Sequence, residues 1–109
     1  MAMDVATLRR LVALDEKDPL SRFALARKLF ETDPSMAALE EAAVHLEFAN
    51  KHAPEHLATY HIYGQVLAKL GRKEEARRVY QAGLARTAGI GEGMGRDLAP
   101  AIQKLLERL

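Results

Sequence analysis

Four histidines are the residues of this chain best suited to bind a metal ion. His45, His52, His56 and His61 fall within seventeen residues, and imidazole is a common metal ligand. A metal site needs ligands that converge on one point, however, and Pro54 separates the first two histidines from the last two. No carboxylate or cysteine completes a tetrahedral set. We therefore expect solvated or hydrogen-bonded histidines and no metal cofactor.

A glycine-rich stretch from Gly89 to Arg96 invites comparison with phosphate-binding loops. A dinucleotide fingerprint would need a glycine where Met94 stands, and it would follow a strand. No lysine followed by serine or threonine makes a phosphate loop, and the carboxylate of Glu92 would repel a phosphate. The stretch is better explained as a connection between two helices, and no nucleotide cofactor is expected.

Catalytic groups are not paired in any recognisable pattern. Three pairs of adjacent acids lie near expected helix ends, namely Asp15-Glu16, Glu40-Glu41 and Glu74-Glu75. The last two pairs are expected in first turns, where negative charge favours the helix dipole. Neighbouring side chains project about 100° apart on a helix, so they form no catalytic dyad. Ser21 and Ser35 are the only serines, and Ser35 is expected to cap a helix. We therefore do not expect an enzyme.

The charge of the chain is nearly balanced overall but unevenly spread. The net charge is +1. Residues 1–55 carry seven Lys/Arg and ten Asp/Glu, a balance of −3, and residues 56–109 carry nine and five, a balance of +4. The basic residues are dispersed over several expected helices, whereas nucleic-acid binding usually needs a clustered basic stripe. No nucleic-acid partner is expected, although the gradient could orient an acidic partner or favour head-to-tail association.

The composition favours packed helices in one small domain. Hydrophobic residues make up 49% of the 109 residues and aromatic residues only 6%, with few β-branched side chains. The absence of cysteine excludes disulfides and thiolate metal sites. The first ten residues lack the apolar core of a signal peptide, and no apolar run is long enough to span a membrane. A cytoplasmic protein without a membrane partner is expected.

A pattern of large and small residues occurs twice along the chain. The two copies are Leu25-Ala26-x2-Leu29 followed by Ala42-x3-Leu46-x2-Ala49, and Tyr63-Gly64-x2-Leu67 followed by Ala76-x3-Tyr80-x2-Gly83. Small residues let two antiparallel helices approach, and their large neighbours fill the grooves beside them. Ala26 and Gly64 are 38 residues apart. The first copy holds four extra residues, expected in the turn 32–35, and without them the period is 34.

The second copy resembles the tetratricopeptide repeat family, in particular its short stand-alone bacterial members. The matching residues are Tyr60-x2-Tyr63-Gly64-x2-Leu67-x3-Gly71-x4-Ala76-x3-Tyr80-x2-Gly83-Leu84. The first copy departs from the family pattern: Arg22 stands where a bulky aromatic is usual, and Asn50 stands where leucine is usual. The resemblance covers roughly residues 19–90. It implies a right-handed α-solenoid of two helical hairpins that binds a protein partner.

We expect one all-α domain over residues 1–109, with a capping helix at each end. Hydrophobic spacing and cap residues predict helices near 4–15, 20–31, 36–52, 55–70, 73–87 and 97–109. The first repeat then covers about 19–54, the second about 55–88, and a glycine-rich loop 89–96. Asp97 is the expected N-cap of the last helix, with Pro100 in its first turn. This helix carries an apolar stripe that can seal the stack, formed by Leu98, Ile102, Leu105, Leu106 and Leu109.

The family resemblance implies a concave groove lined by the first helix of each hairpin. By helix phase, the groove candidates are Leu20, Phe23, Arg27 and Phe30, followed by His61, Gln65, Ala68 and Lys69. Such a groove would accept an apolar side chain together with an acidic group or a backbone carbonyl of a short peptide. The terminal-carboxylate clamp of some family members is not expected, because Phe23 and His61 replace clamp residues. The alternative is that Phe23 and Phe30 pack beneath the first helix and leave no groove.

A second contact patch is expected on the outward side of the helix 36–52. Val44 and Phe48 are four residues apart and lie opposite Leu46, and exposed apolar pairs often mark contacts. The first helix could instead cover them. The leading interpretation is a module that binds an unidentified protein or peptide, as a monomer or weak homodimer. The alternative is a structural module that self-associates through apolar helix faces, and nucleic-acid binding is a less favoured third interpretation.

Overall fold

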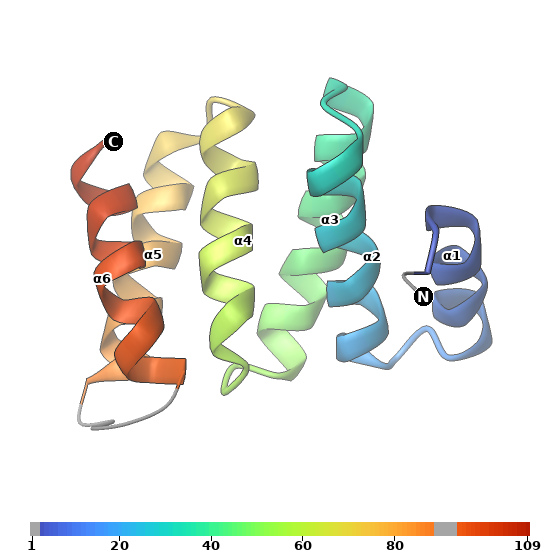
Figure 1. The fold of residues 1–109 in the computed structure, drawn as a ribbon, viewed down its shortest axis with the longest axis horizontal. Coiled ribbons are helices and arrows are strands. Elements are labelled where there is room, and N and C mark those ends of the chain that lie inside the picture. The colour runs from blue at the N-terminus through green and yellow to red at the C-terminus, as the bar shows by residue number, and fades with distance from the viewer. Residues whose placement is uncertain (1–2, 89–93) are drawn as a thin grey trace. The chain divides into compact units, whose positions relative to one another are not determined.

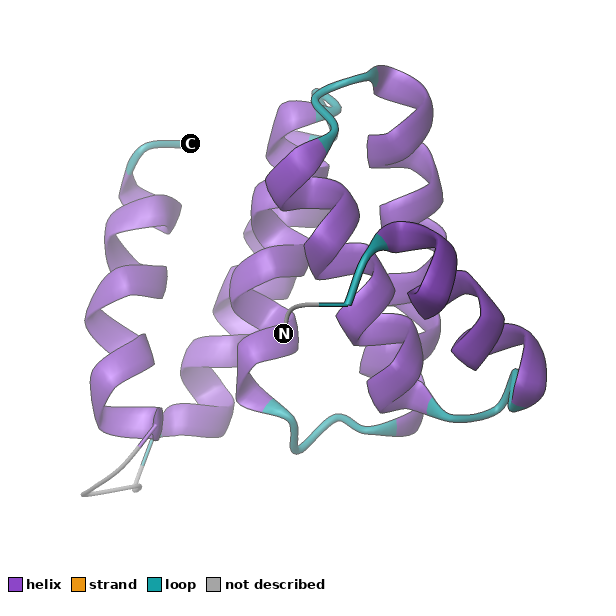
Figure 2. Ribbon diagram, turned by 45° about the vertical axis from the view of Figure 1, so that its right-hand side comes forward, coloured by secondary structure: helices purple, strands orange, loops and turns teal. Residues whose placement is uncertain are grey.

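Every regular element in the described part of the chain is a helix. The computed structural model describes residues 3–88 and 94–109, and over these residues no strand occurs (Figure 2). In chain order the elements are α1 (Val5–Leu14), α2 (Pro19–Thr32), α3 (Met36–His52), α4 (Leu57–Lys69), α5 (Lys73–Thr87) and α6 (Met94–Glu107) (Figure 1). The predicted all-α class is confirmed. Contacts divide the chain into two units, Met1–Pro54 and Glu55–Leu109.

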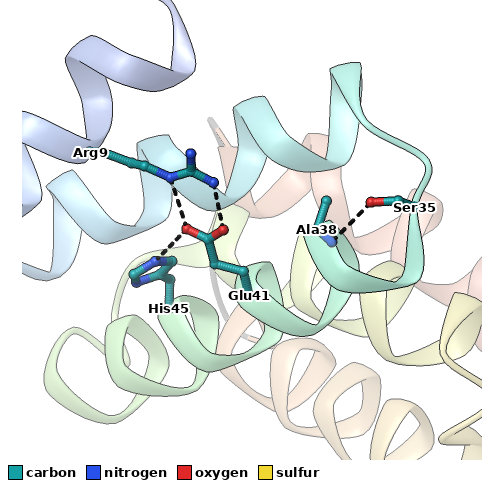
Figure 3. A network of polar contacts seen from close by, with 5 residues as sticks. All are labelled: Arg9, Ser35, Ala38, Glu41 and His45. Atoms are coloured by element: carbon teal, nitrogen blue, oxygen red, sulfur yellow. Dashed lines mark hydrogen bonds and ion pairs between the residues drawn. The ribbon is translucent and has the colours of Figure 1, made fainter.

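The helices of the first unit begin at acidic or hydroxyl side chains. The Asp4 carboxylate accepts a hydrogen bond from the Thr7 amide at 2.8 Å and caps α1. Asp18 caps α2, with Pro19 in the first turn. The predicted cap at Ser35 is confirmed, because its hydroxyl accepts from the Ala38 amide at 3.2 Å (Figure 3). These bonds satisfy amides that have no partner within their helix.

The core of the first unit forms where α2 and α3 pack together. Ala26 and Ala42 are fully buried, and Leu25, Leu29 and Leu46 are at most 2% exposed. This is the small-and-large pattern that the sequence repeat predicts. α1 packs on α2 through the buried Leu8 and Val12. The first unit is therefore a helical hairpin with one further helix on its first member.

The four extra residues of the first repeat do not lie in its turn, so that expectation is wrong. α2 ends at Thr32 and α3 begins at Met36, which leaves a connection as long as the one between α4 and α5. The additional residues instead extend α2 at its end and α3 at its start. The Ser35 cap lets α3 begin early, and its added turn buries Ala38 and Leu39.

A polar network joins α1 to α3. Glu41 lies in the second turn of α3, not in its first turn as the sequence suggests. Its carboxylate lies between Arg9 and His45, as Figure 3 shows. Arg9 Nη2 is 2.7 Å from Glu41 Oε1, and His45 Nε2 is 3.5 Å from Glu41 Oε2. The Arg9 hydrogen bond lowers the pKa of Glu41, and burial lowers the pKa of His45. The network supplements the apolar contacts of α1 with a charged bond to α3.

The second unit is built on the hairpin of α4 and α5, where glycines face tyrosines. A Cβ atom added to Gly64 would overlap the Tyr80 ring, and one added to Gly83 would lie 2.7 Å from the Tyr60 Cβ. Both tyrosines are at most 3% exposed. Each glycine therefore creates the space that an aromatic ring of the opposite helix occupies, as expected for closely packed helices.

Gly71 follows the end of α4 in a left-handed backbone conformation. Its φ angle is +80°. The Arg72 amide bonds to the Leu67 carbonyl at 2.9 Å, and the Gly71 amide bonds to the Ala68 carbonyl at 3.0 Å. This is the Schellman arrangement, which satisfies the last carbonyls of the helix and turns the chain into α5.

α6 completes the second unit by packing against α5 and α4. It begins at Met94 and not at Asp97, so the predicted N-cap is wrong, and Pro100 lies inside the helix. Asp97 falls in the first turn, where its charge favours the helix dipole without capping it. Residues 89–93 of the predicted loop lie outside the described residues. Ile102 is fully buried, whereas the leucines of the predicted stripe are half-buried.

Candidate functional site

The predicted groove residues belong to two different units. Leu20, Phe23, Arg27 and Phe30 lie on α2 in the first unit. His61, Gln65, Ala68 and Lys69 lie on α4 in the second. The two sets therefore lie in separate units, each beside the other helices of its own unit.

The α2 set is partly covered by α1. Phe23 is only 8% exposed, and together with Leu8 of α1 it lines an open hollow of about 380 Å³. Arg27 lines the same hollow but is exposed, and its Nε atom is 3.6 Å from Glu31 Oε2. Leu20 is 53% exposed, whereas Phe30 is half-buried. Phe23 therefore serves mainly to pack α2, in line with the alternative that it lies beneath the first helix.

The α4 set lies at a smaller hollow within the second unit. Its volume is about 220 Å³. Gln65, Ala68 and Lys69 contribute from α4, and Tyr80 contributes from α5. The remaining wall comes from the end of α6 and the residues after it, namely Leu105, Arg108 and Leu109. Three segments of one unit thus surround a single small space.

Helical spacing explains why these side chains share the hollow. Gln65 and Lys69 are four residues apart and lie on one face of α4, with Ala68 beside them. The Tyr80 ring reaches this region because Gly64 has no side chain to exclude it. Leu105 and Arg108 are three residues apart and bring one apolar and one cationic group from the last turn of the chain. The small Ala68 leaves the space that the other residues enclose.

The hollow combines an apolar floor with positive charge. Neither Lys69 nor Arg108 has an acidic partner within residues 3–88 and 94–109. Burial raises the pKa of Tyr80 to about 12, so its hydroxyl stays protonated and can donate a hydrogen bond at neutral pH. That hydroxyl has no hydrogen-bond partner in the described part of the chain. The site can therefore donate hydrogen bonds to an anionic or carbonyl oxygen.

His61 orients the amide of Gln65 and does not itself line the hollow. The Gln65 Nε2 atom donates to the His61 carbonyl at 3.1 Å and lies 3.4 Å from the His61 ring Nε2. Because the Gln65 amide nitrogen is engaged in this way, its Oε1 atom remains as an acceptor. Burial lowers the pKa of His61 and favours the neutral ring. His61 thus acts on the hollow through Gln65.

The two residues of the predicted second patch, Val44 and Phe48, line another hollow in the first unit. Its volume is about 420 Å³. Val44 is 62% exposed, but Phe48 is half-buried. The Arg22 guanidinium lies 4.0 Å from the centroid of the Phe48 ring, and the His52 ring centroid lies 4.2 Å from it. These contacts are typical of a cation–π interaction and a tilted ring pair. α1 makes no backbone contact with α3 and does not cover Val44.

The other histidines have separate local environments. The His56 ring Nδ1 lies 2.8 Å from the Thr59 hydroxyl at the start of α4. His52 packs on Phe48, and His45 faces Glu41. Over the described residues, no group of three His, Cys, Asp or Glu side chains converges as a metal site would require. Nor does any helix among them have the length and apolar character needed to cross a membrane.

The sequence analysis missed four residues of the second-unit hollow: Tyr80, Leu105, Arg108 and Leu109. It assigned Tyr80 to hairpin packing and the leucines of α6 to an apolar seal. The available signal was the spacing of Leu105 and Arg108, which places a cation at the edge of that seal. Helix phase alone could not show that this edge faces α4.

Comparison with known proteins does not extend these observations. No protein-family model matches the chain, and comparisons with curated proteins and with solved structures also give no match. The candidate site therefore depends on its own geometry and chemistry.

Proposed function

We propose that this chain is a protein–protein interaction module of the tetratricopeptide type, and that it binds a short peptide segment of a partner. The binding site is the hollow formed by α4, α5 and α6, which we call the α4–α6 hollow. The proposal depends on one observation: the predicted groove residues Gln65, Ala68 and Lys69 of α4 line one hollow in the structure. The proposal includes a cytoplasmic location and the absence of catalytic activity.

The size of the α4–α6 hollow supports a peptide anchor over a large substrate. Sites for small molecules usually enclose about 300–1,000 Å³, and this one has about 220 Å³. That space accommodates one or two side chains of a partner. Peptide recognition commonly depends on a few buried anchors with hydrogen bonds around them. Ala68 and Leu105 supply the apolar contact, while Gln65 and Tyr80 supply polar groups.

An unbiased selection of displayed random peptides tests the proposed function. We expect enriched peptides that bind the whole chain and lose binding to the Ala68→Phe variant, because a phenyl ring would fill the hollow. Ala82→Phe is the matched control, since Ala82 is exposed on α5 and does not line the hollow. Circular dichroism should show equal helicity for both variants. Failure to enrich any peptide sensitive to Ala68→Phe would overturn the proposal.

Self-association is a second candidate function, favoured by exposed apolar side chains in the first unit. The large apolar residues that are most exposed among those described are Met3, Leu11, Leu14, Leu20, Met36 and Val44. Leu14 is 82% exposed. Sedimentation at several concentrations tests this candidate: a concentration-dependent dimer that Leu14→Lys or Val44→Lys weakens would support it. A strict monomer would remove it.

A further inference from the structure

The α4–α6 hollow is bordered by two cations that no acidic side chain in the described part of their own unit pairs with. Lys69 and Arg108 border the hollow, no acidic side chain lines it, and neither cation has an ionic partner among the described residues. Residues 55–109 carry nine Lys/Arg and six Asp/Glu, so the whole unit has a net charge of +3. The local and the overall charge therefore both favour an anionic ligand.

The apolar part of the hollow sets a second requirement. Ala68 and the side chain of Leu105 lie beside the two cations. An anion alone would leave this apolar surface in contact with water, whereas a neighbouring aliphatic side chain would cover it. The volume of about 220 Å³ suits one aliphatic side chain together with a carboxylate.

Gln65 distinguishes an internal peptide segment from a chain end. Its Nε2 atom donates to the His61 carbonyl at 3.1 Å, so Oε1 is the amide atom that remains to accept a hydrogen bond from a ligand. A peptide that continues through the site has amide N–H groups for this acceptor and carbonyl groups for the Tyr80 hydroxyl. A terminal carboxylate offers only acceptors and would be opposed by Gln65 Oε1.

Building on the proposed function, we infer that the ligand of the α4–α6 hollow is an internal acidic–aliphatic peptide segment. An Asp or Glu side chain binds between Lys69 and Arg108, and an adjacent leucine-like side chain packs against Ala68 and Leu105. The main chain of the segment bonds to Gln65 and Tyr80.

Fluorescence anisotropy with defined peptides tests this ligand class. The probe is a labelled octapeptide of alternating leucine and glutamate, blocked at both ends. We expect it to bind the whole chain at least about tenfold more tightly than the same peptide with glutamine in place of glutamate. A third peptide has neutral glutamines and a free terminal carboxylate, and it should bind no better than the blocked glutamine peptide.

Charge variants locate the interaction in the hollow. Lys69→Gln combined with Arg108→Gln should weaken binding of the glutamate peptide about tenfold and reduce its dependence on salt. The matched control is Lys73→Gln with Arg86→Gln, which removes the same charge from exposed α5 residues outside the hollow. This control should change binding less than about twofold.

The outcomes separate the ligand class from the proposed function. If selected peptides lack acids, lose binding with Ala68→Phe and ignore Lys69→Gln with Arg108→Gln, then peptide binding stands and the acidic class is overturned. Tighter binding of the free-carboxylate peptide than of the blocked glutamate peptide would assign the site to chain ends and also overturn the inference. If both double variants lose the same binding affinity for the glutamate peptide, the effect comes from net charge alone. That result would also overturn the inference. If no peptide binds, both proposals fall.

Discussion

The hairpins α2–α3 and α4–α5 use different side chains where their two helices pack together. In the second hairpin, Gly64 lies against the ring of the buried Tyr80. At the corresponding positions of the first hairpin stand Ala26 and Leu46, both fully buried. At this crossing the repeat therefore preserves the combined size of a small and a large residue, not the residues themselves.

The hairpins also differ at the position where Arg22 replaces Tyr60. Tyr60 is buried against Gly83 in the second hairpin. Arg22 instead donates a hydrogen bond from Nε to the Glu16 carbonyl at 2.7 Å, and its guanidinium covers Phe48. The first hairpin thus loses an aromatic contact in its core and gains a polar and aromatic cluster at its edge.

Removal of the Tyr80 ring should cause the largest loss of stability among the changes that separate the two hairpins. Tyr80→Ala should lower the free energy of unfolding by about 4 kcal/mol, because a large buried ring leaves a cavity beside Gly64. Leu46→Ala in the first hairpin should cost about 3 kcal/mol. Urea unfolding followed by circular dichroism measures both. A loss below about 1 kcal/mol for Tyr80→Ala would contradict the packing described.

Alanine at Gly64 should have opposite effects in two backgrounds. In the native sequence, Gly64→Ala should destabilise by about 1–3 kcal/mol, because its methyl group overlaps the Tyr80 ring. In the Tyr80→Ala background it should stabilise by up to about 1 kcal/mol, since alanine favours helix and the ring is gone. Urea unfolding of the four proteins gives the coupling. Ala26→Gly in the first hairpin is the control and should destabilise by about 1 kcal/mol, through helix propensity.

A single alanine substitution should lower the free energy of unfolding by different amounts in the turns of the two hairpins. Gly71→Ala should destabilise by about 1 kcal/mol through its backbone alone, because φ is +80° and no atom lies within 4 Å of an added Cβ. All three tyrosines lie in the second unit, so tyrosine fluorescence reports that unit selectively. Asp33→Ala at the other turn removes the bond from the Ser35 amide to Asp33 Oδ1 and should cost about 0.5 kcal/mol. Equal fluorescence midpoints for Gly71→Ala and the native chain would contradict the strain assigned to Gly71.

Acidification should produce the smallest of these differences in stability between the two units. Burial lowers the pKa of both His45 and His61 from the usual 6.5, so stability is full above that pH and falls as the pH drops through the folded pKa. The Glu41 carboxylate opposes the shift at His45, whereas Arg22 and Arg9 add to it. No carboxylate opposes the shift at His61. His61→Gln should therefore remove more of the loss of stability below pH 6.5 than His45→Gln does.

Hydrogen exchange of α3 and α4 amides as a function of pH measures this difference. Below the usual Glu41 pKa of 4.5, loss of the Arg9–Glu41 bond should add a further decrease in the first unit. Exchange that is more sensitive to pH in α3 than in α4 above that value would contradict the ranking of the two histidines.

The sequence predicted the helices well where caps and spacing agreed. Ser35 and Pro54 bound α3, whose limits were predicted correctly as 36–52, and Gly71 ends α4 through its positive φ. The start of α6 was predicted too late, because Asp97 has the chemistry of both a cap and a first-turn acid. The four extra residues were assigned to a turn because periodicity counts residues but does not show whether they are helical.

Residue types and spacing by themselves determined the all-helical class and the small-and-large pairs that pack each hairpin. These features depend on local backbone preferences and on a repeat of side-chain volume, both of which can be read along one chain. Only the tertiary structure placed Leu105 of α6, and Arg108 just after it, beside Gln65 and Lys69 of α4. It also placed Phe23 against α1 and left Val44 exposed. Those outcomes depend on which face of one helix meets another, and that choice is made by packing over the whole unit.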